Sequence, residues 1–484
     1  MENTELYYKK MTETPVARLV VRLGIPTTVA MLITSIYNLV DTYFVGTLGE
    51  SAQGAIGILF TLQSIIQAVA FMLGHGSGTY VAKELANKDV KKATRYVSSA
   101  FFVGGIIGVL FLAVGLIALT PLMRLLGATD TILPYARDYG MWVLIACPFM
   151  ICSIVLNNNL RYEGKALFAM IGLGAGGVLN MLLDWLFVFG CGLGVFGAGM
   201  ATAISQVASF VILLILYLKK AQSTISMRAI SRDAKLYFSI FKNGLPSLIR
   251  QCLNSVSGGI LNILAGRYGA QIDAADATIA AMSIVNRVSN FVMCVGMGIS
   301  QGLQPVASFN WQAEQYKRVK NALTVTMLIC LACVVVLAVP VMAAPQVFVR
   351  LFQKEQTVVD IATPALRYAM LGLLFMPLFI PANMLFQSIR KAGIASFLAL
   401  LRSGLIFIPL LYLLTFLWQI AGLQTAQPVS DALTALINVP FLIWFYLKMP
   451  GTKGGEKTTE NVSEQADKMA DDQAPTAQDT NQTN

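Results

Sequence analysis

The sequence has little charge and almost no histidine. Only 12% of its 484 residues are Asp, Glu, Lys or Arg, and a single residue is histidine. An ordinary soluble domain has roughly 25% charged residues, so this chain has too little polar surface to solvate a globule. Enzymes of hydrolysis or group transfer need a nucleophile with a base, or a metal cluster. The sequence has one histidine and no set of residues with metal-ligand spacing, which argues against both kinds of catalytic site. We therefore expect that the protein is not an enzyme.

Cysteines are few, and they do not form a framework. The seven stand at positions 147, 152, 191, 252, 294, 330 and 333, nearly all of them in apolar stretches. Cys330 and Cys333 have CxxC spacing, but they lie inside a Leu and Val run, where small residues serve helix packing. The pattern predicts no disulfide scaffold and no zinc site. We expect no cofactor.

Long apolar runs dominate what is present. Hydrophobic residues make up 56% of the chain, in stretches that match the roughly 20 residues that cross a bilayer core. The fold class predicted is all-α and integral to the membrane. We expect twelve transmembrane helices, near residues 18–45, 51–75, 96–120, 137–159, 166–190, 195–218, 243–266, 275–300, 320–343, 361–387, 394–418 and 425–447.

Basic residues set the predicted orientation. If both termini are cytoplasmic, the inner segments hold 26 of the 35 Lys and Arg residues and the outer segments hold 6, with Arg250, Arg287 and Arg402 inside helices. This is the positive-inside pattern of a multi-pass protein, here in the plasma (cytoplasmic) membrane. The net charge of +10 is divided among short loops, so we expect the lipid bilayer as a partner and no nucleic acid.

The chain repeats itself. A shift of 220 residues aligns Gly24 with Gly244 and Pro26 with Pro246, and a shift of 226 aligns Lys165 with Lys391. Six crossings per half make the two repeats parallel, which is a general design for alternating access around a central cavity. The predicted organisation is an N-terminal lobe over 1–218, a cytoplasmic linker over 219–242, a C-terminal lobe over 243–447 and a disordered cytoplasmic tail over 448–484.

Two acids stand out inside the first half. Asp41 and Asp184 lie in predicted helices, where an ionisable group costs about 2.5 to 3.5 kcal/mol on insertion scales. Asn180 is one helical turn before Asp184, and Thr202 lies at a similar predicted depth. Oxygen ligands beside two carboxylates suit either a bound cation or a held proton. The alternative is that both acids are hydrogen-bonded spacers. Their repeat positions, Leu261 and Leu410, carry no acid.

Two motifs carry a family resemblance. The stretch Asn180-Met181-Leu182-Leu183-Asp184, followed by Gly192 to Thr202, resembles the signature of multidrug and toxic compound extrusion (MATE) transporters. Pro26 with Asp41, and Gly302-Leu303-Gln304-Pro305-Val306, agree with it. The resemblance spans residues 15–447 and points to the branch of bacterial and archaeal drug exporters. It implies a V-shaped pair of six-helix lobes that exports cationic or amphipathic small molecules in exchange for sodium or hydrogen ions.

The resemblance also implies site residues. Asp41, Asn180, Asp184 and Thr202 match the cation site of the first lobe, with Ala198 as a carbonyl neighbour, and sodium is the only metal expected. For the substrate cavity we expect Tyr37, Asn38, Met282 and Met293. A lipid-linked precursor flippase or a metabolite exporter of the same superfamily is the alternative function. We expect a monomer, and the roles of Arg250, Arg287 and His75 stay open.

Overall fold

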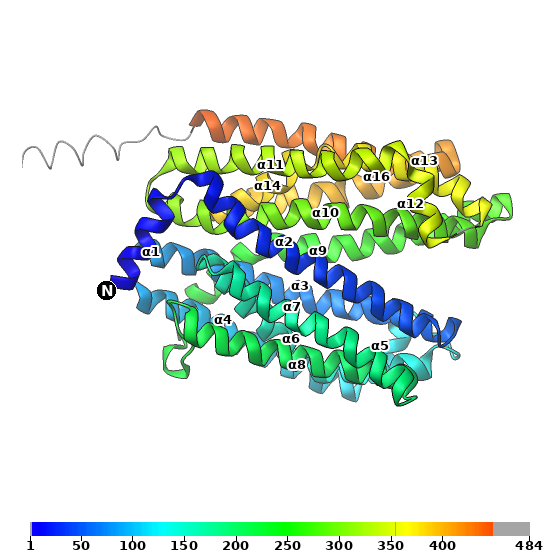
Figure 1. The fold of residues 1–484 in the computed structure, drawn as a ribbon, viewed down its shortest axis with the longest axis horizontal. Coiled ribbons are helices and arrows are strands. Elements are labelled where there is room, and N and C mark those ends of the chain that lie inside the picture. Colours follow the sequence, from blue (N-terminus) through cyan, green and yellow to red (C-terminus); the bar gives the residue numbers. More distant parts are fainter. Residues whose placement is uncertain (1, 354, 449–484) are drawn as a thin grey trace, which may run out of the picture.

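The computed structural model describes residues 2–353 and 355–448, which form helices joined by short turns (Figure 1). The α-helices are α1 (Glu2–Glu13), α2 (Val16–Gly46), α3 (Glu50–Ala86), α4 (Val90–Ile117), α5 (Leu119–Leu125), α6 (Leu133–Tyr162), α7 (Ala166–Asp184), α8 (Gly194–Lys220), α9 (Ala234–Gly269), α10 (Ala275–Gln312), α11 (Tyr316–Ala343), α12 (Pro345–Phe352), α13 (Gln356–Leu373), α14 (Met376–Ser388), α15 (Ala392–Leu400) and α16 (Phe407–Lys448). Two π-helical turns, η1 (Trp185–Gly190) and η4 (Leu401–Leu405), follow α7 and α15.

The predicted twelve crossings are confirmed. In the described part of the chain, nine helical stretches are long and apolar enough to cross a membrane, and α13 with α14, bent by 49°, makes a tenth. The stretch Ala392–Lys448 has 57 residues, or about 85 Å at 1.5 Å per residue, more than twice the bilayer core. Its backbone breaks at Gln419, where φ is 50°, so it supplies two crossings. The long helix α9 completes the set.

Some boundaries differ from the prediction. The helix predicted to end at residue 300 continues as α10 to Gln312, because the polar side chains beyond residue 300 are buried against neighbouring helices and not in lipid. The short helices α1, α5 and α12 have too few apolar residues to register as crossings. The predicted tail lies outside the described residues, except for Lys448, which ends α16.

Three hydrophobic clusters hold the helices together. One lies mainly in the first half, where it contains Leu59, Val143 and Ile151, and it also includes Ile240 at the start of α9. A second is confined to the other half and contains Leu261, Met282 and Leu366. The third joins both halves next to α1, where Tyr7 packs edge-on against Phe309. We call this end of the molecule the α1 end; it lies at the left of Figure 1. The halves are therefore packed together at the α1 end.

Hydrogen bonds reproduce the internal repeat. The Asn157 side chain donates to the carbonyl oxygen of Ala169 at 2.9 Å, and the Asn383 side chain donates to that of Ala395 at 2.7 Å. Donor and acceptor are both displaced by 226 residues, the same shift that aligns Lys165 with Lys391. Those two lysines directly precede α7 and α15. The sequence repeat is thus a repeat of side-chain contacts.

Candidate functional site

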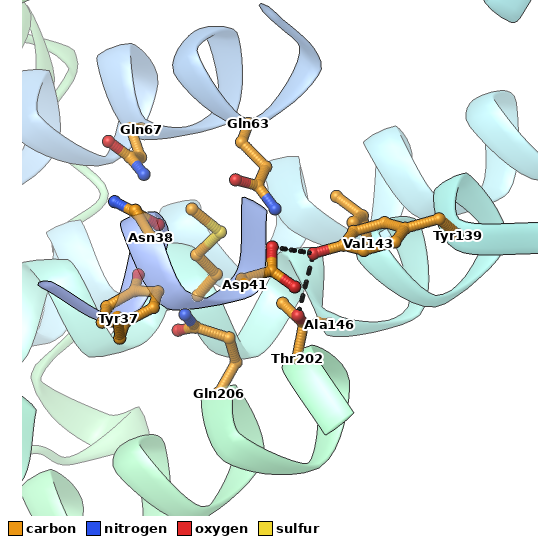
Figure 2. A pocket seen from close by; sticks show the side chains of 11 residues that line it. Tyr37, Asn38, Asp41, Gln63, Gln67, Tyr139, Val143, Ala146, Thr202 and Gln206 are labelled. Carbon is orange, nitrogen blue, oxygen red and sulfur yellow. Dashed lines mark hydrogen bonds between the residues drawn. The ribbon is translucent and has the colours of Figure 1, made fainter. Parts of the chain in front are cut away.

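A small polar pocket in the first half contains Asp41. It lies among α2, α3, α6 and α8, and Figure 2 shows its side chains pointing inward from all four helices. Its volume is about 20 Å³, enough for one water-sized occupant. The lining residues are Tyr37, Asn38, Asp41, Gln63, Gln67, Tyr139, Val143, Ala146, Met150, Thr202 and Gln206.

Tyr139 connects Asp41 to Thr202. Its hydroxyl donates to Asp41 Oδ2 at 3.0 Å and lies 3.0 Å from Thr202 Oγ1 (Figure 2). Asn180 Nδ2 donates to the same threonine oxygen at 3.4 Å. Three of the four residues predicted for an ion site, Asp41, Thr202 and Asn180, therefore belong to one hydrogen-bonded chain across α2, α6, α7 and α8.

Several oxygens of this region are buried without a partner. Asp184 is 0% exposed, and neither of its carboxyl oxygens has a hydrogen-bond partner among the described residues. The same holds for Asp41 Oδ1 and Asn180 Oδ1. Buried polar atoms in proteins are nearly always satisfied, so these oxygens are suited to take up a cation or a proton. Asp184 also ends α7 where the helix widens into the π-turn η1, a feature common at functional sites.

The oxygen atoms in and beside the pocket determine which ion it can bind. Carboxylate, amide and hydroxyl oxygens are hard ligands that suit a cation such as Na⁺. Two carboxylates out of water cannot both remain charged and unpaired, so each ionised group needs a cation or must take up a proton. The residues therefore fit either occupant, sodium or a hydrogen ion.

Some predicted residues lie elsewhere. Ala198 is fully buried in the hydrophobic cluster of the first half and is not part of the pocket lining. Met282 and Met293 belong to the cluster of the second half, and the Met293 sulfur lies 3.1 Å from Arg402 Nη1. Tyr37, predicted for a substrate cavity, lines the small pocket, and Asn38 lines both this pocket and a larger cavity.

Tyr139 and three glutamines were not predicted. Gln63 and Gln67 are one turn apart on α3, and Gln206 is one turn after Thr202 on α8. A polar residue repeated at a spacing of four on an apolar helix marks one face, and this signal was available in the sequence. Tyr139 gave no comparable signal, because a tyrosine near a helix end is usual at the membrane interface.

The second half has leucines at the positions that match the two acids. Leu261 and Leu410, the repeat positions of Asp41 and Asp184, pack in or against the hydrophobic cluster of that half. Its buried acid, Asp431, has a built-in partner: Arg402 Nε lies 2.9 Å from Asp431 Oδ1. Asp431 is therefore compensated within the chain, whereas Asp41 and Asp184 have no ion-pair partner among the described residues.

Comparisons with known proteins agree with these features. The family model described as MatE matches residues 26–186 and 246–413, more than half of the chain. The chain belongs to the MatE family. The matched ranges contain Asp41, Asn180 and Asp184, and they follow the two repeats.

This MatE chain has curated relatives in bacteria. It is 28% identical over 439 residues to the multidrug export protein MepA of Staphylococcus saprophyticus, covering 90% of this chain and 95% of the relative. The MepA protein of Staphylococcus aureus strain N315 is similar, at 28% identity and the same coverage. A solved outward-facing multidrug resistance MATE family transporter superposes with a TM-score of 0.84 at 22% identity, covering 91% of this chain and 97% of the other. The last likeness supports the fold.

A second, much larger cavity lies between the halves of this MatE chain. Its volume is about 960 Å³, and its walls come from α2 and α3 on one side and from α9, α10, α11 and α12 on the other. This size matches cavities that enclose drug-sized ligands. Asn38 lines both this cavity and the small pocket, so the two spaces share a lining residue.

Arg287, Arg250 and His75, whose roles the sequence left open, lie in three different parts of the structure. Arg287 lines the large cavity. Arg250 donates to Asn383 Oδ1 at 2.9 Å, within the second half. His75 is fully buried between the halves, where its Nδ1 atom lies 2.8 Å from Ser247 Oγ.

Proposed function

We propose that the protein is a secondary active exporter, which couples entry of sodium or hydrogen ions to efflux of amphipathic small molecules. The observation that carries this proposal is the pair of buried carboxylates with unpartnered oxygens, next to a cavity of drug size. A transporter needs both spaces, one for the coupling ion and one for the cargo. The relatives named as multidrug export proteins support the same class of function.

Coupling would pass through α2. Asp41 and Asn38 lie on neighbouring turns of this helix, and Asn38 faces both spaces. Proline at position 26 removes a backbone hydrogen bond within α2 and provides a point of bending. Occupation of the pocket by a cation or a proton would favour one bend of α2 and so change the wall of the large cavity.

The remaining features of this proposal follow from the sequence. The lobes 1–218 and 243–447 would rock against each other across the linker 219–242, with both termini on the cytoplasmic side of the plasma membrane. The transporter would act as a monomer, because each chain has its own pocket and its own cavity.

The test is efflux under an imposed ion gradient. Cells or proteoliposomes with the protein are loaded with a fluorescent amphiphile, and release is followed with a sodium gradient, a pH gradient or neither. We expect gradient-driven release in the native chain and its loss in Asp184→Asn and Asp41→Asn. Asp130→Asn is the matched control, because Asp130 is an exposed acid at the surface, paired with Arg124. Full gradient-driven release from Asp184→Asn would overturn the coupling role.

A lipid-linked precursor flippase is the second candidate. Arg287 in the cavity wall favours it, because a cationic group there suits a lipid phosphate. Asp41 and Asp184 have no role in passive lipid movement. Translocation of a fluorescent lipid without any ion dependence would favour the flippase over the exporter.

A further inference from the structure

The charge of the large cavity is opposite to that of the small pocket. Of the described residues that line the cavity, Arg287 is the one with a formal charge, and Asp, Glu and Lys are absent from the lining. No carboxylate among the described residues lies within 4.0 Å of its guanidinium. An uncompensated cation among transmembrane helices is costly, and such residues mark ligand pathways.

We propose that this cavity binds amphipathic organic anions and that Arg287 determines this specificity. The inference rests on the proposed export function and names its substrate class. The guanidinium can donate two parallel hydrogen bonds to a carboxylate, sulfonate or phosphate. The apolar part of the ligand would lie against the hydrophobic side chains of the cavity, which include Phe60, Phe291 and Phe348.

Other polar residues of the cavity lining can donate hydrogen bonds to an anion. Asn254 Oδ1 accepts a hydrogen bond from Ser403 at 2.6 Å, and the amide nitrogen of Asn254 carries two N–H donors. Asn290 lies three residues after Arg287 on α10 and lines the same wall. An ionised acidic group accepts hydrogen bonds only, so these donors complement it.

The cavity also has space where the ligand would lie. Nothing is within 4 Å of the positions that a Cβ atom would take at Gly258 and Gly259, which line the cavity on α9. Larger side chains there would fill part of the volume. The two glycines therefore keep the floor beside Asn254 open to a bulky ligand.

An organic cation is the rival occupant. Aromatic rings of the lining could attract it, but the positive charge of Arg287 would repel it in the same cavity. Asp41 lies with Asn38 in the lining of the small pocket, where its Oδ2 atom accepts a hydrogen bond from Tyr139. A cationic drug would thus have to compete with the coupling ion, whereas an anion would not.

The membrane potential would favour the exchange of an entering cation for an exported anion. Entry of a cation and exit of an anion both move positive charge inward. An inside-negative membrane potential therefore favours both movements, whatever their ratio. For an exported cation, the potential would oppose exit.

The binding test uses two probes of equal length. Purified full-length protein in lipid nanodiscs is titrated with 11-(dansylamino)undecanoic acid and with the dansyl compound that ends in a primary ammonium group. We expect the acid to bind at least roughly tenfold more tightly than the ammonium probe, as for a lost charge-assisted hydrogen bond. In Arg287→Gln this preference disappears, and in Arg287→Lys most of it remains. Arg267→Gln is the matched control, because Arg267 is an exposed arginine of α9 outside the cavity lining.

Three results would overturn the inference: tighter binding of the ammonium probe by the native chain, binding of neither probe, or an unchanged preference in Arg287→Gln. Size-exclusion profiles check that Arg287→Gln is folded, and Arg287→Lys supplies the comparison if it is not. Transport separates this inference from the proposed function. Selective binding of the acid without gradient-driven release of either probe would support the anion site and contradict the exporter. Gradient-driven release of the ammonium probe alone would support the exporter and contradict the anion site.

The source of the anion is tested in the same vesicles. Fluorescent phosphatidylglycerol, with phosphatidylcholine as control, is compared with the soluble acid. Translocation of phosphatidylglycerol that depends on Arg287 supports the anion site with a lipid cargo. Release of only the soluble acid supports it with a soluble cargo.

Discussion

The ring of His75 on α3 lies 2.8 Å, through Nδ1, from the hydroxyl oxygen of Ser247 on α9. Ser247 also accepts a hydrogen bond from Gln387 on α14 at 2.8 Å, and His75 Nε2 lies 3.2 Å from Arg161 on α6. Arg161 in turn donates to Gln301 on α10. These fully or nearly fully buried groups form a polar network between the first and second halves.

Loss of the Ser247 hydroxyl should weaken this network. We expect Ser247→Ala to raise the population in which the halves separate at the α1 end, because a buried histidine and glutamine would lose their shared partner. Spin labels would be attached to cysteines introduced at positions 91 and 317, in a chain whose other reactive cysteines have been replaced. Electron paramagnetic resonance should then report a longer distance between the two labels. Ser239→Ala on the same helix is the control, since its hydroxyl bonds only to the α9 backbone. An unchanged distance distribution would contradict the role.

Tyr139 should tune the small pocket without abolishing it. Tyr139→Phe removes the donor to Asp41 but leaves both carboxyl groups, so export should persist with a changed ion dependence. A hydrogen bond to a charged group contributes about 1.5 to 3 kcal/mol, so the half-saturating ion concentration should change by roughly tenfold or more. Initial efflux rates against sodium concentration and against pH would measure it. Tyr135→Phe, a half-exposed tyrosine of α6, should leave the ion dependence unchanged.

The Arg402 and Asp431 pair should matter mainly for stability. Arg402→Gln leaves Asp431, with a side chain 1% exposed, without its cation, and we expect a loss of about 3 to 5 kcal/mol. Arg402→Leu combined with Asp431→Leu should recover part of this loss. Thermal unfolding in detergent would compare them. Arg124→Gln breaks an exposed pair and should cost less than about 1 kcal/mol. Equal effects of Arg402→Gln and Arg124→Gln would contradict the interpretation.

Glu163 should make stability depend on pH. It lies in the turn between α6 and α7, where burial raises the pKa of its carboxyl above the ordinary value of 4.5, although Tyr217, Ser223 and the Gln222 backbone donate to it. As pH rises above about 4.5, the unfolded chain loses this proton before the folded chain does. The free energy of unfolding should therefore fall with rising pH until the folded carboxyl group has ionised.

Glu163→Gln tests this dependence. The substituted chain should show a flatter plot of melting temperature against pH above about 4.5 than the native chain. Asp130→Asn, an exposed acid, should leave the slope unchanged. Equal slopes for Glu163→Gln and the native chain would show that another group is responsible.

Much of the fold was predictable because the bilayer imposes it. The spans, their number and their repetition followed from apolar runs and from pairs such as Gly24 with Gly244, and the Asn157 and Asn383 contacts repeat with the same shift. Asp41 and Asp184 were recognisable because acids inside apolar runs are costly. The break at Gln419 was expected only as a gap between two spans.

The sequence by itself determined the membrane class, the twelve crossings, the repeat and the positions of the isolated acids, since these depend on composition and spacing along one chain. Only the tertiary structure decided which side chains meet. It joined Tyr139 to Asp41 and Thr202, buried Ala198 and Met282 in hydrophobic clusters, paired Arg402 with Asp431 and left Arg287 in the cavity wall. The physical reason is that helix rotation and helix neighbours depend on packing among segments far apart in sequence, which no local pattern of residues specifies.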